Sequence, residues 1–154
     1  MNLRERITKL LRSGNKEDAD PDTLAQIATI DGVIARSSIP DNLLAYMVVD
    51  LAVERLDCYD KAYPSVFLSF EHAYVKFGSK AERPLIVEIY IPKGTKRVYL
   101  SLFTQNDSAE DDTEMLLQRG SVLRINGVSE IEVDGRCMPI LGATLYQTAP
   151  KPPV

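Results

Sequence analysis

The stretch that decides the fold is Asp112-Thr113-Glu114-Met115-Leu116-Leu117-Gln118-Arg119-Gly120, in which two carboxylates open an apolar segment and a polar turn closes it. Successive side chains of a β-strand point to opposite faces, so Asp112 and Glu114 are expected on one face and Thr113 on the other. Two like charges this close together destabilise a purely structural face. The spacing therefore predicts either a functional site or an exposed edge at the start of this strand.

Helical periodicity marks the residues before Leu43. The first predicted helix has its apolar side chains at Leu3, Ile7, Leu10 and Leu11. Asn2 with Glu5 is typical of a capping box, and Gly14 is typical of a helix end. A second helix is predicted to begin at Asp20-Pro21 and to keep its apolar spacing to about Ser37. Residues 1–40 are therefore expected to be mainly helical.

From Leu43 to Gln147 the pattern changes to short apolar runs separated by turn signals. Strands are predicted over Val66–Ser69, Pro84–Ile91, Arg97–Phe103, Thr113–Leu117, Val122–Ile125, Val128–Val133 and Cys137–Tyr146, with a short helix over His72–Phe77. Periodicity allows either a strand or a helix over Leu43–Leu51. The predicted turns are Pro92-Lys93-Gly94, Gln118-Arg119-Gly120, Asn126-Gly127 and Asp134-Gly135. The predicted fold class is α+β.

Length and composition set further bounds. At 154 residues and 17.2 kDa the chain is expected to form one domain over residues 1–148, followed by a Pro-rich tail at 149–154 that wanders or links. A net charge of -4 argues against stable nucleic-acid binding. A single His and two well-separated cysteines, Cys58 and Cys137, predict no metal site and reduced thiols, although one disulfide stays possible.

The N-terminal segment has no apolar signal core, and no run of the sequence is long enough to span a membrane. We therefore expect a cytoplasmic protein, or one delivered into a host cytoplasm by a route without a signal peptide.

Three ordered segments carry a resemblance to a known family. Phe67-Leu68-Ser69 before a helix, Ile91-Pro92-Lys93-Gly94-Thr95 before a strand, and Glu114 leading into an apolar run resemble the Arg-Ser-Glu type mono-ADP-ribosyltransferases, which include clostridial exoenzymes and bacteriophage relatives. The resemblance covers Ser65 to about Ile125. It implies an ADP-ribosyltransferase-like core of two twisted sheets, and it favours a strand over Leu43–Leu51.

The chain departs from the family pattern at two places. The family's Ser-Thr-Ser reads Ser69-Phe70-Glu71 here, so only the first serine is kept. The family's arginine aligns with Met47, and a methionine cannot make the bidentate contacts to phosphate that arginine makes. Arg55 is the candidate substitute if the following loop folds back.

The resemblance implies a role for each remaining candidate. Glu114 would hold the ribose of NAD and stabilise the positive charge that develops when nicotinamide leaves, with Ser69 as its hydrogen-bonding partner. Asp112 would face the incoming nucleophile. The catalytic candidates are thus Glu114 and Asp112, and the NAD-binding candidates are Ser69 and Arg55.

These residues and the resemblance predict an NAD-dependent mono-ADP-ribosyltransferase that modifies a macromolecular acceptor, expected to be a protein. A role as a phage or bacterial effector fits this prediction. A catalytically silent binding or structural module with the same fold is the competing hypothesis, favoured by Met47 and the lost serine. An unrelated α+β protein is a third possibility.

Overall fold

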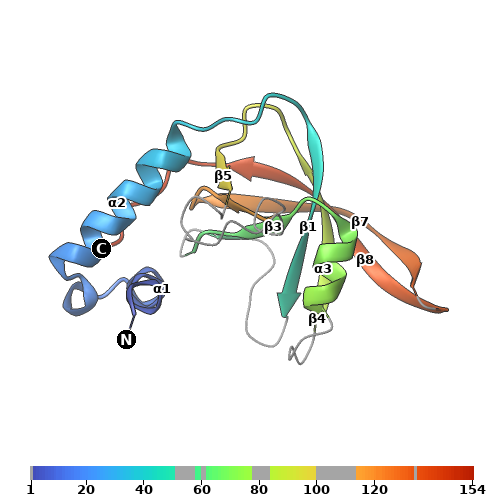
Figure 1. Cartoon of the computed structure of the whole chain (residues 1–154), viewed down its shortest axis with the longest axis horizontal. Helices are drawn as coiled ribbons and strands as arrows, with labels where there is room; N and C mark the ends of the chain where they lie inside the picture. Colours follow the sequence, from blue (N-terminus) through green and yellow to red (C-terminus); the bar gives the residue numbers. More distant parts are fainter. Residues whose placement is uncertain (1, 51–57, 60–61, 78–83, 100–113, 134) are drawn as a thin grey trace.

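The chain folds into a helical part and a β-rich part (Figure 1). The computed structural model describes all residues except 1, 51–57, 60–61, 78–83, 100–113 and 134. Helices α1 (Leu3–Ser13) and α2 (Pro21–Ala35) lie at one end of the molecule together with both termini. The hairpin of strands β7 (Ser121–Val133) and β8 (Arg136–Gln147) projects at the opposite end. Asp112 and Arg55 lie outside the described residues.

Local sequence signals set the bounds of the first helices. Helix α1 spans Leu3–Ser13, with the Asn2 and Glu5 capping box formed at its start and Gly14 in the left-handed conformation, φ 63°, at its end. A short 3-10 helix, η1, spans Lys16–Asp18. Helix α2 spans Pro21–Ala35, and the side chain of Asp20 accepts a hydrogen bond from the backbone N–H of Thr23. These caps satisfy donors that a helix start leaves without intrahelical partners.

The described strands form one mixed sheet. They span Leu43–Asp50 (β1), Cys58–Tyr59 (β2), Ser65–Phe67 (β3), Pro84–Ile91 (β4), Arg97–Tyr99 (β5), Glu114–Leu117 (β6), Ser121–Val133 (β7) and Arg136–Gln147 (β8), and helix α3 spans Phe70–Phe77. Their order across the sheet is β2-β7-β8-β4-β1-β3-β6-β5. All neighbours are antiparallel except β4 and β8. The ambiguous run at Leu43 is therefore a strand.

The short connection between β6 and β7 requires the sheet to curl. Gln118, Arg119 and Gly120 join two strands that lie five places apart in the sheet order. Three residues reach only about 10 Å, whereas five strand spacings in a flat sheet amount to about 24 Å. The sheet therefore bends until β6 approaches β7, and Met115 and Leu117 share one core cluster with Leu123 and Leu145. The prediction of two separate sheets is not confirmed, since one continuous sheet closes over its own core.

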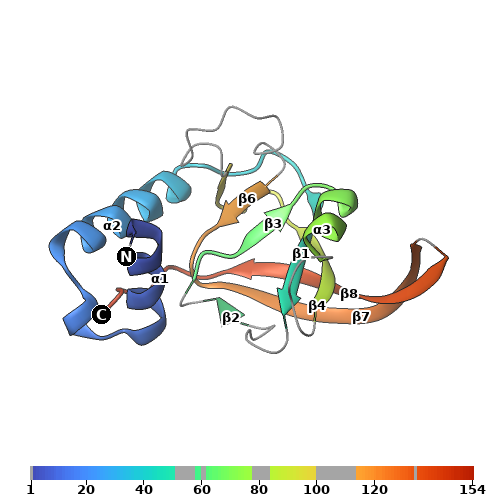
Figure 2. The same cartoon turned by 60° about the horizontal axis from the view of Figure 1, so that its bottom comes forward.

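The sheet has a core face and an outer face around β1. Residues that alternate along β1, namely Ala45, Met47 and Val49, are at most 5% exposed and belong to the core cluster. Tyr46 lies on the outer face, where the ring of Phe70 meets it edge-on at 5.9 Å between centroids. Helix α3 therefore packs on the outer face, against β1 and β4 (Figure 2).

The predicted turn at Asn126-Gly127 is wrong. Strand β7 runs unbroken through it, with a register shift between Ile125 and Gly127 against β8. The side-chain amide of Asn126 donates to Thr144 Oγ1 at 2.7 Å, so this side chain pairs across the strands. Asn126-Gly127 forms a β-bulge instead of a turn because β8 continues to pair with β7 on both sides of it. A bulge bends a strand without ending it.

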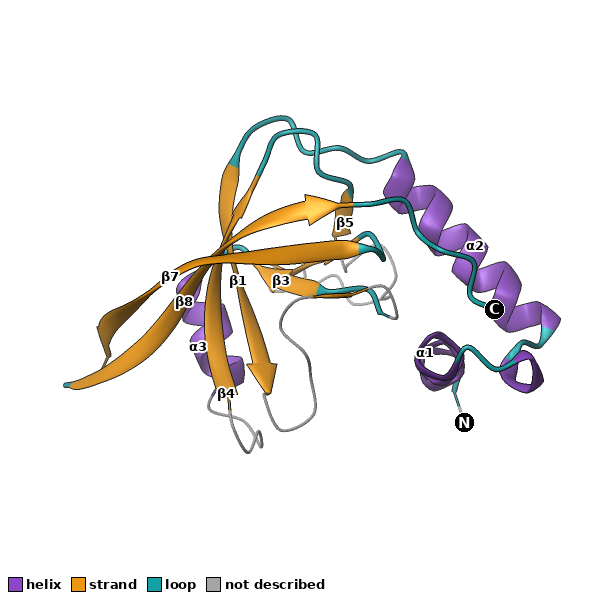
Figure 3. Cartoon of the chain, turned by 180° about the vertical axis from the view of Figure 1, so that it is seen from behind, coloured by secondary structure: helices purple, strands orange, loops and turns teal. Residues whose placement is uncertain are grey.

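The C-terminal tail and the residue before it contact the turn that follows β6. The side chain of Gln118 donates to the carbonyl of Thr148 at 2.8 Å, and Arg119 Nη1 donates to the carbonyl of Lys151 at 2.9 Å. The tail consequently runs back along α2 (Figure 3). Proline has no backbone N–H to pair within a sheet, but the backbone carbonyl groups of the residues beside it still accept hydrogen bonds from side chains.

Candidate active site

Glu114 begins β6 with its side chain half-buried on the outer face of the sheet. It lies opposite Phe67 of β3, and Ser65 of β3 lies opposite Leu116. Ser65 and Glu114 are thus diagonal neighbours on one face, a separation that a long side chain can bridge. The hydroxyl of Ser65 donates a hydrogen bond to Glu114 Oε1. The carboxylate is therefore oriented by a neighbouring strand and does not project freely from an edge.

The strand register places Glu114 in a row that crosses the outer face. Glu114 lies opposite Phe67, Phe67 opposite Tyr46, and Tyr46 opposite Glu88. The hydroxyl of Tyr46 donates to Glu88 Oε2 at 3.1 Å. Burial first, and then the negative charge of Glu88, raise the pKa of Tyr46 above its ordinary value. The carboxylates of Glu114 and Glu88 thus lie at the two ends of this row, and the aromatic residues Phe67 and Tyr46 lie between them.

Helix α3 adds aromatic surface to this row. Phe70 meets Tyr46 edge-on and stacks on Tyr74 with 18° between the ring planes and 5.9 Å between centroids. Both geometries are favourable for aromatic pairs. The outer face beside Glu114 therefore offers flat apolar side chains close to an oriented carboxylate, which suits a ligand that combines an aromatic ring with hydroxyl groups.

Ser69 lies at the start of α3, where its hydroxyl is engaged within the helix end. The backbone N–H of His72 donates to Ser69 Oγ at 3.2 Å, and a short contact joins Ser69 Oγ to His72 Nδ1. This is the arrangement of a helix N-cap. The structure therefore differs from the expected pairing of Ser69 with Glu114, because Ser65 supplies the hydrogen bond to the carboxylate.

Met47 occupies the position that the resemblance aligns with the family's arginine. It is 5% exposed and lies opposite Val87 within the core cluster. Because Tyr46 shares the outer face with Glu114, its neighbour Met47 points to the core face. A cation at this position in this fold would enter apolar surroundings instead of joining Glu114.

An ion pair that the sequence did not reveal joins the turn after β6 to α2. Arg119 is 2% exposed, and its Nη2 lies 2.5 Å from Asp31 Oδ2 while its Nε donates to Asp31 Oδ1 at 3.2 Å. The hydroxyl of Tyr63 also donates to Asp31 Oδ1, at 2.6 Å. Burial and then the hydrogen bond and charge of Asp31 raise the pKa of Tyr63 far above its ordinary value.

A sequence signal for this ion pair exists in α2. Asp31 lies four residues after Ile27 and three before Ile34, both buried, so it stands on the buried stripe of the helix. A lone carboxylate at such a position needs a cationic partner. The partner, Arg119, also stacks its guanidinium 5.8 Å from the centre of the Tyr63 ring.

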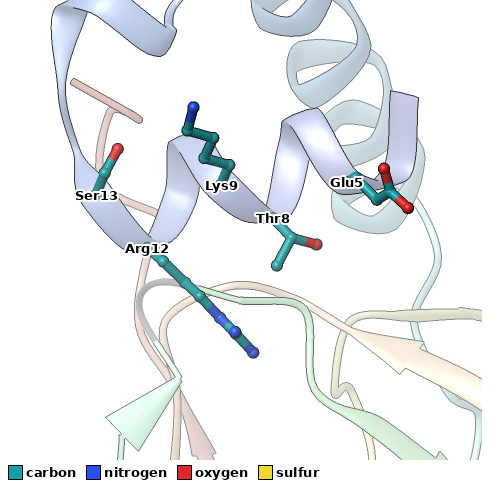
Figure 4. Close-up of a pocket in the computed structure, with 5 residues that line it drawn as sticks. All are labelled: Glu5, Thr8, Lys9, Arg12 and Ser13. Atoms are coloured by element: carbon teal, nitrogen blue, oxygen red, sulfur yellow. The ribbon is translucent and has the colours of Figure 1, made fainter. Parts of the chain in front are cut away.

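A shallow hollow lies along α1, apart from Glu114. Its lining consists of Glu5, Thr8, Lys9, Arg12 and Ser13 (Figure 4), and the Arg12 side chain extends toward the sheet. Lys9 already pairs with Asp18 at 3.4 Å. Within the described residues there is no group of three or more His, Cys, Asp or Glu side chains that could hold a metal ion. None of the described helices has the length and apolar character needed to cross a membrane.

The comparisons with known proteins agree with this geometry. The chain matches the family described as ADP-ribosyltransferase exoenzyme over residues 3–148. The chain belongs to that family. The family predicted from the three sequence segments is therefore confirmed. Among curated protein sequences, none matches this chain.

Several solved structures share the fold. The C3larvin toxin, an ADP-ribosyltransferase from Paenibacillus larvae, is 16% identical with a TM-score of 0.65, over 94% of this chain and 82% of that one. C3stau2 from S. aureus, solved with NAD, is 20% identical with a TM-score of 0.66 over 94% and 82% of the two chains. The Clostridium limosum C3 exoenzyme is 19% identical with a TM-score of 0.65 over 94% and 80%.

Proposed function

We propose that this protein is an NAD-dependent mono-ADP-ribosyltransferase in which Glu114 is the catalytic carboxylate. The observation that carries the proposal is the hydrogen bond from Ser65 to Glu114 at the start of β6, in a chain of the ADP-ribosyltransferase exoenzyme family. A structural edge carboxylate has no need of such a partner. The C3stau2 structure, which was solved with NAD, supports NAD as the co-substrate.

The proposed chemistry is a displacement at the ribose carbon that carries nicotinamide. The bond between nicotinamide and ribose breaks, nicotinamide leaves with the bonding electrons, and a bond forms to a nucleophilic atom of the acceptor. The transition state carries positive charge on the ribose, so an oriented carboxylate stabilises it electrostatically. Glu114 supplies this charge, and Asp112 accepts the proton that the acceptor loses.

The outer face suits part of the dinucleotide. The aromatic side chains of Tyr46 and Phe70 lie on the same face as Glu114 and offer a surface for a flat ring. Ser69 at the start of α3 is the proposed contact to the nicotinamide-bearing half. Because Met47 faces the core, the pyrophosphate needs another cation, and Arg55 is the proposed one.

We propose a protein as the acceptor. C3larvin is described as a toxin, which supports an effector role that is carried out in the cytoplasm of a host cell. Asp112 lies two residues before Glu114, so in an extended chain it would point to the same side as Glu114 and face the acceptor side chain.

Transfer of label from NAD to a host-cell lysate tests this function. Wild-type protein is expected to label an acceptor that protease removes and ribonuclease does not, and Glu114→Gln is expected to abolish the labelling with unchanged unfolding temperature. Glu132→Gln, on the exposed part of β7, is the matched control and is expected to label as the wild type does. Equal labelling by Glu114→Gln would refute the assigned role.

A catalytically silent module is the second candidate, and the burial of Met47 on the core face favours it. A silent module without the family's arginine is expected to bind no NAD. Calorimetric titration with millimolar NAD distinguishes the two, since the enzyme binds with measurable heat and the silent module gives only the heat of dilution.

A further inference from the structure

One serine lies in β3 and another just after it, and the structure gives them different partners. Ser65 belongs to β3 and donates its hydroxyl hydrogen to Glu114 Oε1. Ser69 lies beyond the end of β3, where its hydroxyl contacts both the backbone N–H and the ring of His72. We infer that Ser65 is the positioning residue of Glu114, and that Ser69, the proposed contact to NAD, fixes the start of α3. This inference rests on the proposed function.

The strand register explains why Ser65 reaches the carboxylate. Phe67 lies directly opposite Glu114, so Ser65 is two residues away from the opposed position and on the same face. A serine hydroxyl is short, but a glutamate side chain has enough bonds to lean one diagonal step along the neighbouring strand. The Glu114 side chain therefore leans toward Ser65, and the hydrogen bond fixes one of the two carboxylate oxygens.

The surroundings of β3 make Ser65 a rigid support. The strand is flanked by β1 on one side and β6 on the other, and its central residue Val66 is fully buried. The backbone N–H of Leu117 donates to the carbonyl of Pro64 at 2.8 Å, just before Ser65, which ties the two strands together. A hydroxyl on a fixed strand orients a catalytic group more precisely than one on a loop.

The contacts of Ser69 leave it a different task. A serine has one hydrogen to donate, and its oxygen here also accepts the backbone N–H of His72 at 3.2 Å. That hydrogen bond caps α3, the helix that brings Phe70 against Tyr46. Ser69 therefore fixes the helix that carries the aromatic side chains, while Ser65 orients Glu114. The hydrogen bond from Ser65 occupies only Oε1 of Glu114 and leaves Oε2 for a ribose hydroxyl.

The kinetics of nicotinamide release separate the two roles. Ser65→Ala is expected to lower kcat by about 10- to 100-fold, the range typical for loss of an orienting partner, with KM for NAD nearly unchanged. Ser65→Thr keeps the hydroxyl and is expected to recover most of the rate. Ser69→Ala is expected to raise KM more than it lowers kcat. Ser129→Ala, on the exposed part of β7, is the control and is expected to behave as the wild type.

A double-mutant cycle in urea tests the contact without using activity. The unfolding free energies of Ser65→Ala and Glu114→Ala are expected to be non-additive in the double variant, whereas those of Ser69→Ala and Glu114→Ala are expected to add. Additive effects for the first pair would overturn the inference.

Failure of the inference and failure of the proposed function give different results. An active wild type with unchanged kcat in Ser65→Ala, or a loss of kcat confined to Ser69→Ala, would overturn the positioning role and leave the proposed function standing. A wild type that releases no nicotinamide would overturn the proposed function, and with it the catalytic role of Ser65.

Discussion

The guanidinium of Arg119 lies 2.5 Å from the carboxylate of Asp31, and this ion pair joins the turn between β6 and β7 to helix α2. The side chain of Arg119 is 3% exposed, and that of Asp31 is 21% exposed. Arg119 also donates to the carbonyl of Lys151 in the tail. The turn that follows the strand of Glu114 is thus fixed both to helix α2 and to the C-terminal tail.

Loss of the Arg119 side chain is therefore expected to destabilise the protein strongly. Arg119→Ala leaves Asp31 without its cationic partner, and we expect a loss of about 2–4 kcal/mol, since removal of one member of a buried pair costs about 3–5 kcal/mol and Asp31 is partly exposed. Urea unfolding measures the change. Arg124→Ala, at an exposed position of β7, is the control and is expected to lie within about 0.5 kcal/mol of the wild type. A similar loss in both variants would contradict the assigned pair.

Removal of the tail is expected to weaken the same junction. A chain that ends at Ala149 lacks the carbonyl of Lys151, to which Arg119 Nη1 donates at 2.9 Å. A hydrogen bond from a charged group contributes about 1.5–3 kcal/mol, so the unfolding free energy of the shortened chain should be lower by that amount. Its urea midpoint should fall accordingly. Restoring residues 150 and 151 should recover the stability. Identical unfolding curves for the full and shortened chains would show that the tail does not dock in solution.

Arginine at position 47 is expected to destabilise the fold without restoring a family site. Met47 is 5% exposed on the core face, so Met47→Arg buries a cation without a partner and should cost about 3–5 kcal/mol. Met47→Leu conserves volume and should cost less than about 1.5 kcal/mol. Thermal unfolding and NAD titration check both variants. Tighter NAD binding by a stable Met47→Arg protein would show that position 47 reaches the outer face.

Acid is expected to weaken the start of α2. The hydrogen bonds that Asp20 accepts, first from the Thr23 side chain and then from the Thr23 backbone, lower the pKa of Asp20 below its ordinary value of 3.8. A carboxyl group whose folded pKa is lowered adds stability above its unfolded pKa, and this stability is lost as the pH falls through the folded pKa. As the pH falls below ~4, the unfolding temperature of the wild type should therefore fall more steeply than that of Asp20→Asn. The asparagine caps the helix but does not titrate. Parallel pH profiles would contradict this contribution.

Local signals in the sequence were enough to predict much of the fold. The Asn2 and Glu5 capping box, the apolar run Pro84–Ile91 and the positive-φ glycine of the turn after β6 all appear where the sequence predicts them. At Gly120, φ is 88° and an added Cβ would lie 2.9 Å from the carbonyl oxygen of Thr148. Each of these signals depends on residues that are close in the chain.

Features that depend on distant partners could not be predicted in this way. Asn126-Gly127 carries the signal of a turn, but contacts with Gly142 and Thr144 of β8 continue β7 through a bulge. The choice of Ser65 over Ser69 as the partner of Glu114 depends on the register between β3 and β6, which no local pattern specifies. The same holds for the pairing of Arg119 with Asp31, 88 positions earlier in the chain.

Release of nicotinamide from NAD by the purified protein tests the central claim most directly, because it depends on the carboxylate and needs no acceptor. Our account predicts slow release by the wild type and a loss of at least about 100-fold in Glu114→Gln, which keeps the size of the side chain but removes its charge. Glu132→Gln should release nicotinamide at the wild-type rate. Equal rates for the wild type and Glu114→Gln would contradict the account.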